Sequence, residues 1–438
     1  MHIVEQIIFT IVALVAIFLF AKKVRTIRRN ILLGKDEPEH DRKDRMGERI
    51  KNVVLLAFGQ KKMFKRPLPA VLHFFVYAGF VLINIEVLEI LIDGISGHER
   101  IFLQPLGPFY NWVIGFFEIL AVLTLVAVIT FLIRRNILKL RRFNMPELDG
   151  WPRKDANTIL YIEIVLMTML LIMNAAYSAR LGHNFLISSH LKGPFKDVNP
   201  HTLFIIERSC WWGHILGIFA FLNYLPYSKH FHIILAFPNA YFTRLEPQGE
   251  MKNMKDVQNE VLYMMQPELA PQPAEGAEAV VPRFGAKDVQ DLGWKNLLDA
   301  YSCTECGRCT AVCPANITGK KLSPRKIMMD TRDRLEEVGR EIDAGKDWKE
   351  DGKTLLHDYI TTEELRACTT CNACVEACPV GIEPLDIIAQ LRRNLVMEES
   401  NSPGEWNQMF SNIENNMAPW KFSPDERDKW AEELNAAG

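Results

Sequence analysis

The stretch "CTECGRCTAVCP", residues 303–314, places four cysteines within eleven positions. A second stretch, "CTTCNACVEACP" at residues 368–379, repeats the spacing, so both read C-x2-C-x2-C-x3-C-P. Of the nine cysteines in the 438-residue chain, only Cys210 lies outside these motifs. Thiolates spaced this closely on a short loop can reach several metal atoms of one cluster, so the two motifs decide how the C-terminal part of the chain folds.

This spacing is the bacterial ferredoxin pattern, in which three cysteines of one motif and the fourth of the other bind one [4Fe–4S] cluster. We therefore expect two [4Fe–4S] clusters, one held by Cys303, Cys306, Cys309 and Cys378 and the other by Cys368, Cys371, Cys374 and Cys313. Zinc is one alternative, but zinc sites usually pair two C-x2–4-C units and stop at four ligands. Disulfides are another, which a cytoplasmic location disfavours.

The 54 residues between Cys313 and Cys368 (residues 314–367) exceed the spacing of a compact bacterial ferredoxin. We therefore expect a helical two-cluster domain rather than the small β-containing one.

Long apolar runs crowd the first 240 residues. A membrane-spanning helix needs about 20 mainly apolar residues, and five segments qualify: roughly 3–21, 68–92, 107–133, 158–179 and 203–237. The alternative is a set of buried helices in a large soluble core, but five such runs with charged connectors are rare in soluble chains. Basic residues follow the first run instead of preceding it, so we interpret it as a retained helix, not a cleaved signal.

The orientation follows from the lysines and arginines beside the spans, because positively charged loops stay in the cytoplasm. Residues 21–67 hold fifteen of them and 134–157 hold seven, against one in 93–106 and three in 180–202. The N-terminus is therefore predicted outside the cell. Both cysteine motifs follow the fifth span and are predicted in the cytoplasm, at the inner (cytoplasmic) membrane.

The predicted fold is mostly α, with four parts. Residues 1–240 form a five-helix transmembrane bundle, and 241–290, which are rich in Pro, Glu, Gln and Ala, form a linker. Residues 291–400 form the helical two-cluster ferredoxin domain, and 401–438 form a C-terminal tail. The formal net charge of −2 gives no reason to expect nucleic-acid binding.

Histidines in the spans predict a b-type haem. In one continuous helix, the eighteen residues from His214 to His232 make five full turns, which puts both on one face about 27 Å apart; Pro226 between them predicts a kink. His230 lies on another face. His73, near the cytoplasmic end of the second span, matches the depth of His232, so these two are the predicted haem ligands. His214 has no evident partner, and a lone membrane histidine can also hydrogen-bond to a neighbour or a quinone.

Ionisable groups within the spans are costly and usually face a cavity or a partner. They are Glu86, Glu89, Glu118, Glu163, Glu207 and Arg208. One interpretation is a quinone pocket with a proton path, and the other is mutual pairing, with Glu207 and Arg208 the first candidates. Lys229 is interpreted as an ordinary membrane anchor, and Cys210 as a small packing residue.

The apolar half, with "WWGHILGIFAFLNYLPYSKHFH" at 211–232, resembles the cytochrome b (gamma) subunit of respiratory nitrate reductase and the membrane subunit of heterodisulfide reductase. The motifs "SCTECGRCTAVCP" and "CTTCNACVEACPVGI" resemble the two-cluster ferredoxin-like subunit of heterodisulfide reductase and related glycolate or lactate oxidase proteins. The resemblance places haem ligands on His73, His214 and His232. The position of the family's fourth histidine is occupied by Ile83, which leaves the haem count at one or two.

We expect a membrane-anchored electron-transfer subunit of a quinone-linked oxidoreductase. Its expected partners are the membrane, a quinone, and a cytoplasmic flavin dehydrogenase or a Cys-Cys-Gly iron–sulfur protein, since this chain lacks the Cys-Cys-Gly motif. The alternative is an assembly or metal-handling factor of a respiratory oxidase, which would need a copper-binding feature. A redox sensor would need a signalling domain.

Overall fold

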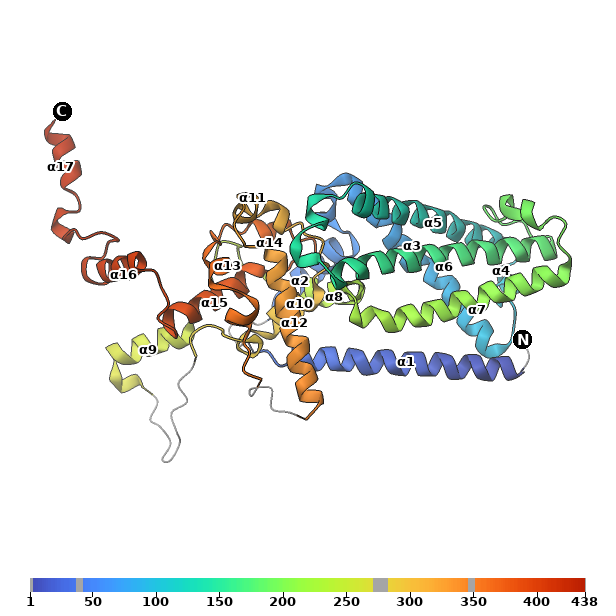
Figure 1. Cartoon of the computed structure of the whole chain (residues 1–438), viewed down its shortest axis with the longest axis horizontal. Helices are drawn as coiled ribbons and strands as arrows, with labels where there is room; N and C mark the ends of the chain where they lie inside the picture. Colours follow the sequence, from blue (N-terminus) through green and yellow to red (C-terminus); the bar gives the residue numbers. More distant parts are fainter. Residues whose placement is uncertain (1–2, 37–41, 271–282, 346–350, 438) are drawn as a thin grey trace.

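The computed structural model describes residues 3–36, 42–270, 283–345 and 351–437. Within these ranges the regular elements are helices, and β-structure is confined to two isolated bridges. Figure 1 shows long helices lying side by side at one end of the molecule and a group of shorter helices at the other. The mostly α fold predicted from the sequence is therefore confirmed.

Among the described residues, four helices are long and apolar enough to cross a membrane: α1 (Ile3–Ile31), α3 (Pro67–Ser96), α5 with its continuation (Pro108–Ile137) and α6 (Trp151–Leu181). They coincide with the first four predicted spans. The fifth prediction falls on α7 (Pro200–Tyr224), which packs along α6 but does not belong to this apolar set. Glu207, Arg208 and His214 interrupt its apolar character, so the five-helix membrane bundle stays a prediction.

Proline and glycine mark the ends of these helices. Pro67, Pro108 and Pro200 stand in the first turn of α3, α5 and α7, where a missing amide proton costs nothing. Gly97 ends α3 and Gly182 ends α6, both with positive φ, which suits the left-handed residue after a helix.

Much of the apolar surface of the bundle faces outward. On α1, large side chains such as Ile7, Ile11, Leu14 and Phe18 are more than half exposed. A soluble protein rarely exposes so continuous an apolar surface. The surface fits contact with lipid and supports membrane association.

The predicted fifth span does not continue as one helix to residue 237. The α-helix α7 ends at Tyr224, two short 3₁₀ turns follow, and α8 spans His232–Tyr241. Pro226 cannot donate an amide hydrogen bond, and Ser228 is extended (φ −115°, ψ 152°). The expectation that His214 and His232 share one face of a continuous helix is therefore wrong, because Pro226 breaks the helix rather than kinking it.

The shorter helices form the domain that carries the cysteines. They are α10 (Trp294–Ser302), α11 (Pro314–Ile317), α12 (Pro324–Asp343), α13 (Thr362–Arg366), α14 (Ala373–Ala377) and α15 (Pro384–Met397). Leu297, Ile327, Leu335, Ile387 and Leu391 lie at the centre of its core and are fully buried.

The cysteine domain and the bundle share one hydrophobic core. Ile27 of α1 and Phe221 of α7 belong to the same buried cluster as the domain's own apolar residues. The end of α1 is also tied to the domain, because Asn30 donates to the hydroxyl of Tyr301 at 2.9 Å. The two halves are therefore packed against each other, not merely tethered.

Part of the predicted linker packs as well. Lys252 forms an ion pair with Asp386 of α15 (2.7 Å), and Ala286 and Val289 are fully buried in the shared core. The linker also holds α9 (Lys255–Met265), while its residues 271–282 lie outside the described ranges. The tail helices α16 (Gly404–Asn416) and α17 (Lys429–Ala436) project away from the domain (Figure 1).

Candidate metal centres

The first cysteine group lines one small pocket. Cys303, Cys306, Cys309 and Cys378 all contribute to its wall, together with neighbouring residues of both motifs. Three of these cysteines come from the first motif and the fourth from the second. The structure thus gathers the set that the spacing of the motifs predicts.

The loop between Cys303 and Cys309 is tight. Glu305 and Gly307 both have positive φ, 51° and 68°. A Cβ at position 307 would lie 2.5 Å from Nη1 of the fully buried Arg325, so only glycine fits there without a shift. These two turns let three cysteines of one short segment point into the same pocket.

The second group comprises Cys313, Cys368, Cys371 and Cys374. Cys313, Cys368 and Cys371 all lie close enough to Cys374 to oppose the ionisation of its thiol. Cys371 is exposed, whereas Cys313 and Cys374 are buried. The second group therefore lies nearer the solvent than the first.

The surroundings of the buried cysteines favour thiolates that bind metal over free thiolates. Burial, and next the neighbouring Cys368 and Cys313, raise the pKa of the Cys374 thiol to about 12. Burial raises the pKa of Cys303 to about 12 and that of Cys378 to about 11. A thiolate is costly in such surroundings unless positive charge compensates it, and iron supplies that charge.

All nine cysteines are free of disulfides. Across the described ranges, no three Cys, His, Asp or Glu side chains come close enough to share a single metal ion. In a [4Fe–4S] cluster each thiolate binds a different iron, so its four ligands need not converge on one point.

The structure brings His73 and His232 together. Their ring centres are 6.4 Å apart, although the residues lie on α3 and α8. An iron between two imidazoles needs two metal–nitrogen bonds of about 2.0 Å, and each ring centre lies about 1.1 Å behind its nitrogen, which gives about 6 Å. The spacing fits a bis-histidine haem iron.

Each ring also has one nitrogen engaged by the protein. The Nδ1 of His73 lies 3.0 Å from Oε1 of Gln60, and the Nδ1 of His232 lies 3.0 Å from the Lys229 carbonyl oxygen. Both partners are acceptors, so Nδ1 carries the proton and Nε2 keeps a free lone pair. This is the arrangement that metal-binding histidines usually show.

The remaining histidines of this region differ in their surroundings. His230, predicted on another face, lies with its ring centre 5.5 Å from that of His232, because the chain turns sharply after Pro226. His214 is buried, and its Nδ1 lies 3.0 Å from the Leu166 carbonyl oxygen. No second histidine ring contacts it in the described part of the chain.

Residues of the first cysteine loop contact the segments that orient both histidines. Glu305 forms a buried ion pair with Lys229, whose carbonyl oxygen accepts from His232. Arg308 donates to the carbonyl oxygens of Lys62 (3.3 Å) and Met63 (3.4 Å), in the turn that follows Gln60. The loop of the first cysteine group thus contacts the two segments that orient the histidine pair.

The sequence did not reveal these linking residues. The interpretation of Lys229 as a membrane anchor is wrong, because its ammonium group is buried against Glu305 and lies 3.8 Å from Asp155. The pairing of Glu207 with Arg208 is confirmed at 3.3 Å, and Arg180 adds a second contact at 2.8 Å. Cys210 packs at the edge of the bundle core, as expected.

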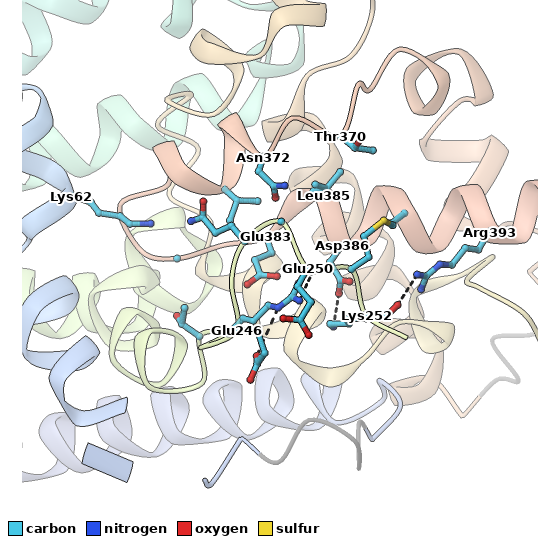
Figure 2. A pocket seen from close by; sticks show the side chains of 18 residues that line it. Lys62, Glu246, Glu250, Lys252, Thr370, Asn372, Glu383, Leu385, Asp386 and Arg393 are labelled. Carbon is cyan, nitrogen blue, oxygen red and sulfur yellow. Dashed lines mark hydrogen bonds and ion pairs between the residues drawn. The ribbon is translucent and has the colours of Figure 1, made fainter. Parts of the chain in front are cut away.

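A larger pocket lies beside the second cysteine group. Figure 2 shows that residues of the predicted linker, including Glu246, Glu250 and Lys252, form one side of it, and Thr370, Asn372 and Asp386 form part of the rest. Thr370 and Asn372 flank the exposed Cys371 in the sequence. The pocket therefore opens where the second group is most accessible from solvent.

Comparisons with known proteins agree with this geometry. Residues 302–382 match the family described as 4Fe-4S dicluster domain. A "Probable iron-sulfur-binding oxidoreductase FadF" of Bacillus subtilis (strain 168) is 30% identical over 98% of this chain and 61% of that protein. An "EtfAB:quinone oxidoreductase" of Syntrophomonas wolfei is 29% identical over 98% of this chain and 60% of that protein.

A further relative matches a shorter part of the chain. It is one subunit of the "Ferredoxin/F(420)H(2)-dependent CoB-CoM heterodisulfide reductase" of Methanosarcina acetivorans, 37% identical over 23% of this chain and 49% of that protein. The chain spans about three fifths of the length of the first two relatives. No solved structure matches it significantly. The chain is thus a homologue of the iron–sulfur oxidoreductases and of this heterodisulfide reductase subunit, with a 4Fe-4S dicluster domain joined to apolar helices long enough to cross a membrane.

Proposed function

We propose that the protein is a membrane-anchored electron-transfer subunit that connects a cytoplasmic redox partner with the quinone pool. In this proposal, the two cysteine groups hold two [4Fe–4S] clusters, and His73 and His232 hold a b-type haem. When bound, these groups supply one-electron carriers. The protein's own part is to hold them close together and to exclude water from between them.

The observation that carries the proposal is the position of the histidine pair. Two rings lie 6.4 Å apart, each with Nδ1 hydrogen-bonded, and the segments that orient them contact the loop that holds three cysteines of the first group. Glu305 and Arg308 fix that loop to the segments around Lys229 and Lys62. The second cysteine group, with the exposed Cys371, then offers the contact for a soluble partner.

The relatives indicate which partners to test. One of them is named as an EtfAB:quinone oxidoreductase. This name suggests two hypotheses for the present chain: its cytoplasmic partner is a flavoprotein, and its partner in the membrane is a quinone. A separate Cys-Cys-Gly iron–sulfur protein is the other cytoplasmic candidate. The proposal places the N-terminus outside the inner membrane and the cysteine domain in the cytoplasm, as the charge of the loops predicts.

His214 is left with a role apart from the first haem. It could be the ligand of a second haem only with a partner from another element, and Ile83, where the resembling families have a histidine, is buried in the bundle core. We propose one haem per chain and a contact with quinone for His214, whose Nδ1 is fixed by the Leu166 carbonyl oxygen.

The test measures electron flow to quinone in membranes that contain Cys306→Ala or Cys371→Ala. Each variant should abolish quinone-linked electron flow, because each removes a ligand from a different cysteine group, while insertion into the membrane is retained. Cys210→Ala is the matched control and should keep the wild-type rate. Unchanged flow in both ligand variants would contradict the proposal. Wild-type protein that holds clusters but neither haem nor quinone activity would favour the assembly or metal-handling alternative.

A further inference from the structure

Three buried carboxyl groups follow one face of α3 at the end of the bundle far from the cysteine domain. Glu86, Glu89 and Asp93 are spaced by three and four residues and are almost completely buried. Glu86 lies thirteen residues beyond His73, which corresponds to about 20 Å along the helix. The row leads from the interior of the bundle toward the end of α3 at Ser96.

The outer two of these carboxyl groups are well supplied with donors. Glu89 accepts from the Phe102 amide at 3.0 Å and from the Tyr110 hydroxyl at 2.7 Å. Asp93 accepts from the amides of Arg100 (2.7 Å) and Ile101 (3.0 Å). These hydrogen bonds satisfy the carboxyl oxygens of both residues, which are therefore not left without partners.

One buried cation faces the row. Arg100 donates to the Tyr110 hydroxyl at 3.0 Å and to Oδ1 of Asn174 at 2.5 Å, and its guanidinium lies 4.3 Å from the ring centre of Tyr177. Tyr110 thus receives a hydrogen bond from Arg100 and gives one to Glu89. Arg100 is thus linked to Glu89 through the Tyr110 hydroxyl, while its charge also faces Glu86, to which it donates no hydrogen bond.

Glu86 differs from its neighbours. Its side chain is 3% exposed, and neither of its oxygens has a hydrogen-bond partner. The charged or polar groups that face it are Glu89 on its own helix, Glu118 of α5, Asn174 of α6, and Arg100. Nδ2 of Asn174 and Oε1 of Glu118 also lack partners, whereas Oε2 of Glu118 accepts from two backbone amides.

A negative charge on Glu86 would be buried, unbonded and close to two further carboxyl groups. Such a charge is strongly disfavoured, because a buried ion without hydrogen bonds has lost the solvation that water gives it. A neutral carboxyl group avoids this loss of solvation. After small rotations, Oε1 of Glu118 would accept a hydrogen bond from its proton, and Nδ2 of Asn174 would donate one to its oxygens.

We propose that Glu86 is a proton-binding site that exchanges its proton with the far end of the bundle through Glu89 and Tyr110. The proposal deepens the proposed function and rests on it where quinone is concerned. To become quinol, a quinone takes up two electrons, which a haem held by the histidine pair would supply, and two protons. The Glu86 O–H bond breaks, the proton forms an O–H bond with one quinone oxygen, and the carboxylate that remains faces the charge of Arg100. A proton from solvent then restores the carboxyl group, which gives the second proton to the other quinone oxygen in the same way and is restored again from solvent.

The first test does not need quinone. The hydrophobic reagent dicyclohexylcarbodiimide attacks protonated carboxyl groups in a membrane domain, and mass spectrometry of the full chain locates the product. We expect modification at Glu86 and none at Glu207, a buried carboxyl group that forms ion pairs with two arginines. An unmodified Glu86 at pH 7 would overturn the proposal.

The second test is an infrared difference spectrum between the reduced and the oxidised protein. A carbonyl band of a protonated carboxyl group should change on reduction in the wild type and be absent from the difference spectrum of Glu86→Gln. Glu86→Asp keeps a carboxyl group and should restore a band, which separates loss of the proton site from loss of folding. A spectrum in Glu86→Gln identical to that of the wild type would contradict the proposal.

Quinone kinetics complete the test. Glu86→Gln should slow quinone reduction by about 100-fold or more, the usual effect of removing a proton donor. Glu99→Gln, in the exposed loop after α3, is the control and should keep the wild-type rate. If the wild type does not reduce quinone, the proposed function fails, and the modification experiment still decides the state of Glu86. If the wild type and Glu86→Gln react equally fast, only the proton site is refuted.

Discussion

The ion pair between Glu305 and Lys229 gives a quantitative prediction about the contact between the cysteine domain and the bundle. Both side chains are buried, at 3% and 10% exposure, and removing one partner of such a pair usually costs about 3–5 kcal/mol. In Glu305→Gln, Lys229 keeps the Pro152 carbonyl oxygen at 2.6 Å and Asp155 at 3.8 Å. Arg332 also loses its contact with Glu305 (2.8 Å), so we expect a loss of at least about 3 kcal/mol.

The assay is thermal unfolding of the full chain in detergent, followed by tryptophan fluorescence. A loss of about 3 kcal/mol should lower the melting temperature by about 6–12 °C for a unit of the size of the bundle. The double variant Glu305→Gln/Lys229→Met removes both charges and should lose less than the sum of the two single variants, by about 1–3 kcal/mol.

A second pair between the same two halves of the protein is the matched control. Lys65 pairs with Glu376, but their side chains are 58% and 50% exposed. An exposed pair contributes at most about 1 kcal/mol, so Lys65→Met should shift the melting temperature by no more than about 4 °C. Equal shifts for the buried and the exposed pair, or strict additivity in the double variant, would refute the assignment of the docking contact to Glu305.

Two further predictions concern the cysteine domain. Gly307→Ala puts a side chain at a residue with positive φ, 2.5 Å from Nη1 of Arg325, at a cost of at least about 1–2 kcal/mol. The iron content should therefore fall from roughly eight toward roughly four atoms per chain. An unchanged iron content of roughly eight atoms would contradict this prediction. Burial acts to raise the pKa of Asp386, but the ion pair with Lys252 outweighs it and holds the pKa below its ordinary value. The contact is therefore present above about pH 4 and is lost as the pH falls through the lower pKa of the folded state. Asp386→Asn should speed hydrogen exchange in residues 243–252 at pH 7, and unchanged exchange would show that other contacts hold this segment.

Local patterns in the sequence predicted four of the five proposed spans and the cysteines that line one pocket. Apolar length predicted the four helices that can span a membrane, and the repeated spacing predicted which cysteines the chain brings together. The depth of His73 along its helix also matched that of His232, because α3 is regular from Pro67 onward. Each of these inferences depends on residues within one helix or one short loop.

The remaining features depend on contacts between distant segments. Glu305 meets Lys229 across 76 positions, and Arg308 reaches the turn at Lys62 across 246. No periodicity or motif marks such pairs. Pro226 was recognised as a disruption, but whether it kinks or ends a helix is decided by the packing of the chain that follows, so the position of His230 beside His232 could not be predicted.

The central claim is tested most directly by the visible difference spectrum of the dithionite-reduced and the air-oxidised purified protein, together with the haem-to-protein ratio. The account predicts a low-spin b-type spectrum at about one haem per chain, lost in His73→Ala and His232→Ala and retained in His214→Ala. The control His201→Ala, outside the site, should match the wild type. A wild type without haem, or haem retained at full ratio and low spin in both His73→Ala and His232→Ala, would contradict the account.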